Sequence, residues 1–131
     1  MKIVKCILLL AFVSFSSLQV SAKNPFEIVV SSLATALKTG NAKELSAHFM
    51  NNVSLSLKRD ERVYTRFQAE LLINDFFRSN KVTQLKELQR AKSSTNSFVV
   101  FSLRTNTSTY RVFVKLIESN NIYRVSEFRV E

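Results

Sequence analysis

Apolar residues recur with two different periods along this chain, and the change of period divides it into two parts. Between residue 26 and about residue 80 they are mostly three or four positions apart, which is the spacing of an amphipathic helix. From about residue 81 onward they tend to occupy every second position, which is typical of strands with one buried face. The pattern therefore predicts helices first and a meander of antiparallel strands after them.

Three helix starts share one local pattern, in which an Asn or Thr precedes a Glu or Gln by three positions. Two such residues can satisfy each other's free backbone N–H groups in a capping box. The pattern occurs at Asn24–Glu27, Asn41–Glu44 and Thr65–Gln68. Pro25 favours the first start, and Gly40 can adopt the left-handed conformation that ends a helix. We expect three helices, the second one short, with Leu45 and Phe49 facing inward.

The third helix is expected to have an apolar stripe of Ala69, Leu72, Ile73 and Phe76, with Phe77 at its edge, and to end at Asn80. Strict alternation over residues 53–58 predicts a strand before this helix, and the charged run over residues 58–62 predicts an exposed loop. Further strands are expected over residues 82–92, 98–103, 110–117 and 122–130. A change of apolar parity in the last strand predicts a β-bulge near Ser126. The predicted order is α-α-β-α-β-β-β-β, and the fold class is α+β.

The first 22 residues predict a cleaved signal peptide. Lys2 and Lys5 precede an apolar run over residues 6–15, and small residues ending at Ala22 supply a cleavage site. The apolar run is shorter than the roughly 20 residues of a membrane-spanning helix, so we expect no transmembrane segment in the mature chain. Cys6 lies at the start of the run, which argues against lipoprotein attachment. We expect residues 23–131 to be one domain in the periplasm or outside the cell.

Cleavage would remove the single cysteine and two of the 19 basic residues. The mature chain would hold 17 basic and 10 acidic residues, a net charge of +7. Such a charge favours anionic partners such as acidic glycans or lipid headgroups, although solubility alone can also explain it. Export argues against nucleic acid as a partner.

Several stretches of the mature chain carry a family resemblance. They are Gly40-Asn41-Ala42, Gln68-Ala69-Glu70, Asp75-Phe76-Phe77, Tyr110-Arg111-Val112 and Ile122-Tyr123-Arg124-Val125. Together with the order of elements, they resemble the nuclear transport factor 2-like (cystatin-like) superfamily and, within it, small exported bacterial proteins called domain of unknown function 4783. The resemblance implies a cone in which a curved antiparallel sheet wraps around helices and encloses a pocket. It carries no catalytic signature.

Some enzymes of this superfamily, such as steroid isomerases and dehydratases, place an Asp or His inside the cone for proton transfer. The resemblance therefore raises His48, Tyr64 and Asp75 as catalytic candidates, with Glu118 beside them. The sequence favours a structural role for each of the first three. Asp75 lies on the flank of its helix's apolar stripe, His48 borders an apolar position, and Tyr64 occupies the position of a hydrophobic staple.

Metal and cofactor chemistry has little support in the sequence. One histidine, no cysteine in the mature chain and scattered carboxylates do not form a zinc or iron site. One glycine cannot build a glycine-rich phosphate loop. We therefore expect no metal and no cofactor.

Five basic residues in the predicted strands are the main binding candidates: Arg104, Arg111, Lys115, Arg124 and Arg129. If the strands pair in sequence order, several of them share one face of the sheet as a basic band that could bind a ligand or polyanion. They could equally be a solvated face whose long side chains cover apolar residues. Alternation also places Phe113 and Ile117 on this face, which would suit pairing of two protomers.

The sequence thus leads to one principal hypothesis and two alternatives. The principal hypothesis is an exported, non-enzymatic domain that binds a small apolar ligand or a partner protein at the cell envelope. The first alternative is an isomerase or dehydratase that uses a pocket Asp or His. The second is polyanion binding through the basic face of the sheet.

Overall fold

The computed structural model describes residues 24–131, so the predicted signal peptide lies outside the described residues. This part of the chain forms three helices and six strands. The helices are α1 (Pro25–Thr39), α2 (Ala42–Ser46) and α3 (Arg66–Ser79). The strands are β1 (Phe49–Leu57), β2 (Asp60–Thr65), β3 (Val82–Ala91), β4 (Ser97–Thr105), β5 (Thr109–Ser119) and β6 (Ile122–Val130). The α+β class and the expected order of helices and strands are confirmed, with one strand added.

The added strand, β2, occupies most of the segment that was expected to be an exposed loop. Lys58 and Arg59 have φ angles of 58° and 83° and form a tight turn, after which β2 pairs antiparallel with β1. The expectation of exposure was correct, because nearly all of β2 is exposed. The expectation of a loop was wrong, because β1 supplies β2 with backbone hydrogen bonds, which require no burial of its side chains.

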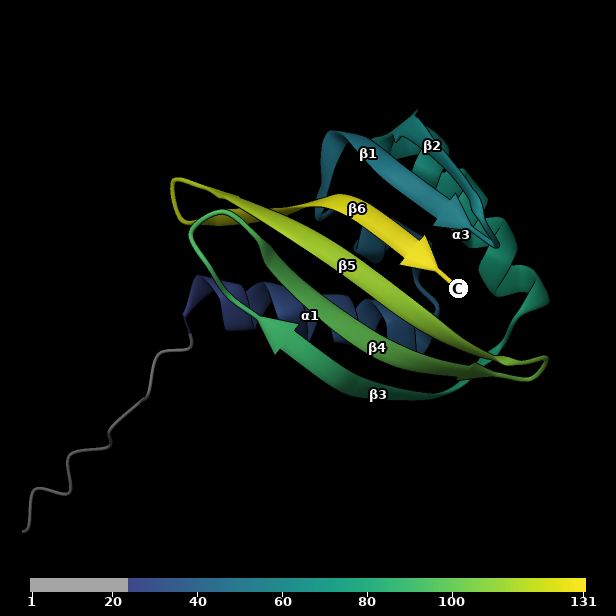
Figure 1. Ribbon diagram of the computed structural model, residues 1–131. Coiled ribbons are helices and arrows are strands. Elements are labelled where there is room, and N and C mark those ends of the chain that lie inside the picture. Colours follow the sequence, from purple (N-terminus) through teal and green to yellow (C-terminus); the bar gives the residue numbers. More distant parts are fainter. Residues whose placement is uncertain (1–23) are drawn as a thin grey trace, which may run out of the picture.

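The six strands form one curved sheet in the order β2-β1-β6-β5-β4-β3. All neighbouring pairs are antiparallel except β1 and β6, which are parallel. Figure 1 shows α1 behind the strands β3 to β5 and α3 beside β1 and β2. We call the face that packs against the helices the inner face and the opposite one the outer face.

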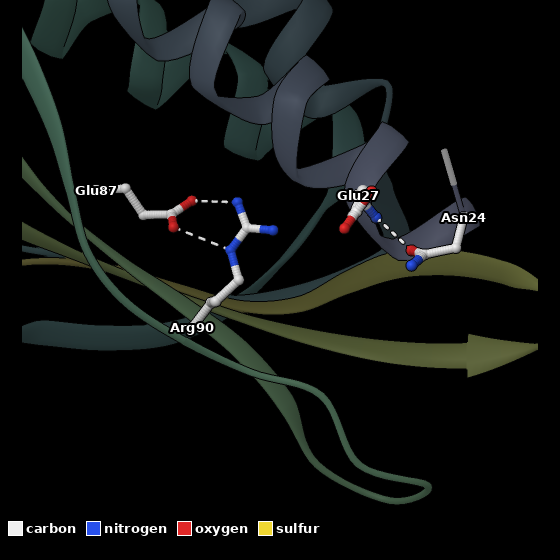
Figure 2. Close-up of polar contacts among 4 residues, drawn as sticks. All are labelled: Asn24, Glu27, Glu87 and Arg90. Carbon is white, nitrogen blue, oxygen red and sulfur yellow. Dashed lines mark hydrogen bonds and ion pairs between the residues drawn. The ribbon is translucent and has the colours of Figure 1, made fainter. Parts of the chain in front are cut away.

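The ends of the helices follow from their capping residues. The Asn24 side chain accepts a hydrogen bond from the backbone N–H of Glu27, as Figure 2 shows. Gly40 has a φ angle of 63° and ends α1, and the next N–H group, of Asn41, reaches back to the Ala36 carbonyl. None of the described helices is long and apolar enough to cross a membrane.

The three expected capping boxes differ in the structure. At the start of α3 both bonds are present, between Thr65 and Gln68. At α2 only the Asn41 side chain acts as a cap, since its backbone N–H already closes the end of α1. The short α2 ends before Phe49, which is buried as expected but as the first residue of β1.

Apolar side chains from every helix and from the inner face of the sheet form one core. Strand β4 illustrates the alternation, because Val99, Phe101 and Leu103 point inward and are at most 1% exposed. Val100, on the outer face, is also buried, so β4 is covered on both sides as expected. Strand β6 shifts register between Val125 and Glu127, which confirms the bulge predicted near Ser126.

The edge strand β3 also shifts register between Glu87 and Gln89. Residues three apart in a regular strand point to opposite faces, but the extra residue brings Glu87 and Arg90 to the same inner face. Their side chains form a two-point ion pair, with nitrogen–oxygen distances of 2.6 and 2.9 Å. Figure 2 shows this pair turned toward the start of α1, so charge replaces apolar packing along this edge.

A polar cluster joins the end of α3 to the β4–β5 hairpin. Asn80 is 5% exposed and donates a hydrogen bond from its side-chain amide to the Phe76 carbonyl. Its Oδ1 accepts hydrogen bonds from the hydroxyl groups of Thr107 and Tyr110, the latter at 2.9 Å. One side chain therefore holds three segments together.

Candidate functional site

The inner face of the sheet is filled by side chains where the resemblance implies a pocket. Phe49, Phe101 and Phe128 are among the largest fully buried residues, and the Phe49 and Phe128 rings lie 5.7 Å apart. Tyr110, on the inner side of β5, packs edge-on against Phe76 of α3 at 5.2 Å. The hollows that we find in residues 24–131 are each lined in part by exposed residues. This packing weakens the hypothesis of a small ligand inside the cone.

The catalytic candidates lie on separate elements and do not form a site. Asp75 on α3 is 71% exposed and lies 3.7 Å from the Arg78 guanidinium. Tyr64 on β2 is partly buried and pairs across the strands with Val53, and Glu118 is exposed near the end of β5. No hydrogen bond or ion pair between residues 24 and 131 joins any two of these candidates or His48.

His48 is half-buried between α2 and β1. Its backbone carbonyl accepts a hydrogen bond from Val125 at 2.8 Å, and its neighbours include Thr35 of α1 and Glu44 of α2. Burial is the main cause that lowers the pKa of His48 below its usual 6.5, and the nearby Arg124 guanidinium lowers it further. The neutral form of His48 is thus favoured at neutral pH, which fits the predicted boundary role.

The lowered pKa of His48 predicts a loss of stability as the pH falls. The unfolded chain binds a proton near pH 6.5 and the folded chain binds it only at lower pH, so stability present above 6.5 is lost below it. We expect His48→Gln to reduce this loss, as measured by urea unfolding at pH 7.5 and pH 5.5. Because His48 is the single histidine, the variant isolates its contribution. An equal loss in both proteins would contradict the prediction.

The structure brings the five predicted basic residues together on the outer face. Strand register places Ser102 opposite Arg111, Phe113 opposite Arg129, and Ile117 opposite Arg124. Each of these pairs shares one face because directly opposed residues point the same way. We call Arg104, Arg111, Lys115, Arg124 and Arg129 the outer-face cations.

Aromatic side chains lie among the outer-face cations. The Phe98 and Phe113 rings stack at 5.7 Å, and the Arg129 guanidinium lies 4.6 Å from the centre of the Phe113 ring. Because the guanidinium is planar, it can cover the ring while its edge stays free for polar contacts. Sequence alternation predicted a mixed basic and aromatic face, but the stack itself depends on the pairing of β4 with β5.

The outer-face cations differ in how far they are neutralised. Arg129 lies 3.1 Å from a Glu127 oxygen and 3.9 Å from a Glu131 oxygen. None of the other four has a carboxylate within 4.0 Å among residues 24–131. Arg104, Arg111 and Arg124 are exposed and Lys115 is partly buried. Lys115 stands opposite Glu127 in the register of β5 and β6, so the three exposed arginines are the cations most available to an anion in solution.

Within residues 24–131, no three potential His, Cys, Asp or Glu ligands come together as a metal site. Two features of the outer face were not predicted from the sequence. One is an apolar hollow where Met50 of β1 lies beside the β5–β6 hairpin. The other is the pairing of Arg129 with Glu127 and Glu131. Met50 could not be assigned from the local pattern, because its position depends on the parallel pairing of β1 with β6.

Solved structures of bacterial proteins resemble this chain over most of its length. A DUF4783 family protein from Bacteroides ovatus ATCC 8483 is 27% identical, has a TM-score of 0.73, and covers 76% of this chain and 91% of its own. One from Bacteroides uniformis ATCC 8492 is 24% identical with a TM-score of 0.75, and covers 79% and 95%.

A more distant structure extends the likeness of fold. An NTF-2 like protein of unknown function from Silicibacter pomeroyi DSS-3 is 9% identical with a TM-score of 0.57, covering 82% of this chain and 93% of its own. No match is found among curated proteins. Residues 30–131 match the family described as Domain of unknown function (DUF4783). The chain therefore belongs to the DUF4783 family and has the NTF2-like fold.

Proposed function

We propose that this protein is an exported, non-enzymatic binding domain that engages a polyanionic partner at the cell envelope through the outer face of its sheet. The observation that carries the proposal is the set of four outer-face cations that have no carboxylate within 4.0 Å among residues 24–131 and share their sheet face with the stacked rings of Phe98 and Phe113. The predicted signal peptide supports export, and the separation of Asp75, His48 and Tyr64 supports a role other than proton transfer.

The spacing of the cations suits a polymer better than a small anion. Arg111 and Lys115 are four residues apart on one strand, which corresponds to about 14 Å, with Phe113 between them. A small anion could touch only one of them, whereas successive charges of an extended polymer could reach both. The exposed edges of the aromatic rings can contact apolar parts of the same polymer.

The proposal predicts a specific loss of salt-dependent binding to heparin, which serves as the polyanion probe. We expect Arg104→Gln combined with Arg111→Gln to weaken binding and to lower the slope of log affinity against log salt by about two, or one per lost contact. Titrations at several salt concentrations would measure both quantities.

Lys38→Gln combined with Lys43→Gln is the matched control, because it removes the same charge from exposed positions on the helical side. The control should keep the slope of the unmodified protein. Equal slopes for the two double variants would mean that net charge, and not the outer face, drives binding, and would refute the proposal. Homodimers in sedimentation experiments that are lost in the outer-face variant would instead identify this face as a protomer contact.

A further inference from the structure

A small apolar hollow opens on the outer face at the end of the β5–β6 hairpin. Figure 1 shows the turn of this hairpin at the upper left of the sheet. Its volume is about 250 Å³. It is lined by Met50, Ile117, Ser119, Asn120, Ile122 and Arg124. Volumes of about 300 Å³ and above are usual for drug-sized ligands, so this hollow suits a smaller or narrower molecule.

Two isoleucines make the hollow apolar although it faces solvent. Ile117 is 40% exposed and Ile122 is 54% exposed. The register pairs Ile117 with Arg124 and Ser119 with Ile122, so all four side chains lie on the outer face. Asn120 and Asn121 have φ angles of 53° and 62°, which fixes a two-residue turn and holds the isoleucines in place. The apolar wall is therefore part of a regular hairpin.

Arg124 is the one charged residue in the lining. No carboxylate between residues 24 and 131 lies within 4.0 Å of its guanidinium. The nearby His48, whose pKa is lowered by burial and then by the Arg124 charge, is either neutral or cationic and so brings no negative charge to Arg124. The Glu44 carboxylate, on α2, acts in the opposite direction and raises the pKa of His48. A guanidinium with no carboxylate partner among residues 24–131, set beside an apolar wall, suits a ligand with an anionic head and an apolar body.

We propose that this hollow binds the carboxylate and first methylenes of a free fatty acid with a single, medium-length chain. The guanidinium of Arg124 can donate hydrogen bonds to both carboxylate oxygens in a two-point, charge-assisted contact. The chain then lies against Ile117 and Ile122, and the flexible Met50 side chain adjusts to its shape. The site shares Arg124 with the cations proposed above for the polymer, but its apolar wall at the hairpin end is distinct from Arg104 and Arg111, which the heparin test removes.

Titration of the full-length protein with octanoate, decanoate and decanol tests this proposal by calorimetry, below the concentrations at which micelles form. We expect decanoate to bind saturably and more tightly than octanoate. The affinity should rise by up to about fourfold per added methylene, as long as the chain still contacts the apolar wall of the hollow. Arg124→Gln should weaken decanoate by about 10-fold or more, because it removes a charge-assisted contact, and should leave decanol unchanged. Ile122→Asn should reduce the dependence on chain length.

Arg104→Gln is the matched control, since it removes the same charge from the same face at another strand and should not affect decanoate. The proposal is overturned if decanoate does not saturate, if Arg104→Gln and Arg124→Gln weaken it equally, or if anionic phospholipid vesicles bind while free decanoate does not. Heparin titrations of Ile122→Asn separate the two proposals. Unchanged heparin binding with weakened decanoate binding supports the hollow as a site of its own, whereas intact decanoate binding with its full chain-length dependence in this variant overturns it.

Discussion

Replacement of Phe101 by alanine is expected to lower the free energy of unfolding by about 3–5 kcal/mol. Phe101 is 1% exposed and occupies the middle of β4 on the inner face of the sheet. Its removal takes apolar surface out of the core and leaves a hollow that the rigid sheet cannot fully close. Such a loss is a large part of the 5–15 kcal/mol that stabilises an ordinary domain.

Urea unfolding of Phe101→Ala and Phe98→Ala measures how much of this loss comes from the inner face. Phe98 lies on the same strand but on the outer face, where it is only partly buried and stacks on Phe113. We expect Phe98→Ala to lose about 1–2 kcal/mol. Phe101→Leu, which keeps most of the volume, should lose about 1 kcal/mol and remains measurable if the alanine variant does not fold.

The same variant distinguishes a filled cone from a ligand-binding one. An apolar cavity made by truncation stays dry and can bind a molecule such as benzene. We therefore expect benzene to stabilise Phe101→Ala and to have no effect on the unmodified protein. If both proteins responded, or if the two Phe→Ala variants lost the same stability, the interior would be loosely packed and a ligand inside the cone would again be the better hypothesis.

The helices were predictable because their signals are local. Thr65 and Gln68 are three residues apart, and the hydrogen bonds that join them to the backbone lie within one turn. Asn80 at the end of α3 and the turn at Asn120 also follow from conformations that these residues favour. In each case the residues that determine the structure are neighbours in the sequence.

The sheet was predictable only in part, because strand pairing is non-local. Strand β2 was not predicted, because its charged residues show no alternation of apolar and polar positions and because backbone pairing with β1 is what makes it a strand. The parallel contact between β1 and β6 joins Ser54 to Glu127, which are far apart in the chain. No local pattern specifies such a partner.

The arrangement of the outer-face cations was also predictable only in part. Alternation along β5 placed Arg111 and Lys115 on one face, and register then added Arg124 and Arg129. The sequence could not tell which cation is neutralised, because the pairing of Arg129 with Glu127 depends on side-chain positions after the bulge. It could not reveal the apolar hollow either, since β1 contributes Met50 only through its contact with β6.

The polar cluster around Asn80 joins the end of α3 to the β4–β5 hairpin, and its removal is the second large effect that we expect. Asn80→Leu should lower the free energy of unfolding by about 2–3 kcal/mol, because the hydroxyl groups of Thr107 and Tyr110 lose their common acceptor. Urea unfolding measures the loss. Tyr110→Phe should cost only about 1 kcal/mol, since Asn80 keeps its other partners.

The double variant shows whether the cluster acts as a unit. In Asn80→Leu with Tyr110→Phe, one of the two orphaned hydroxyl groups is absent, so the loss should be smaller than the sum of the single losses. Additive losses would mean that water already satisfies the Tyr110 hydroxyl and that the hydrogen bonds of the cluster act independently. The β4–β5 hairpin carries Arg104 and Arg111 on its two strands. Loss of its hydrogen bonds to Asn80 should therefore also weaken heparin binding, although no charge is removed. Heparin titration of Asn80→Leu therefore connects the stability of the core to the proposed binding face.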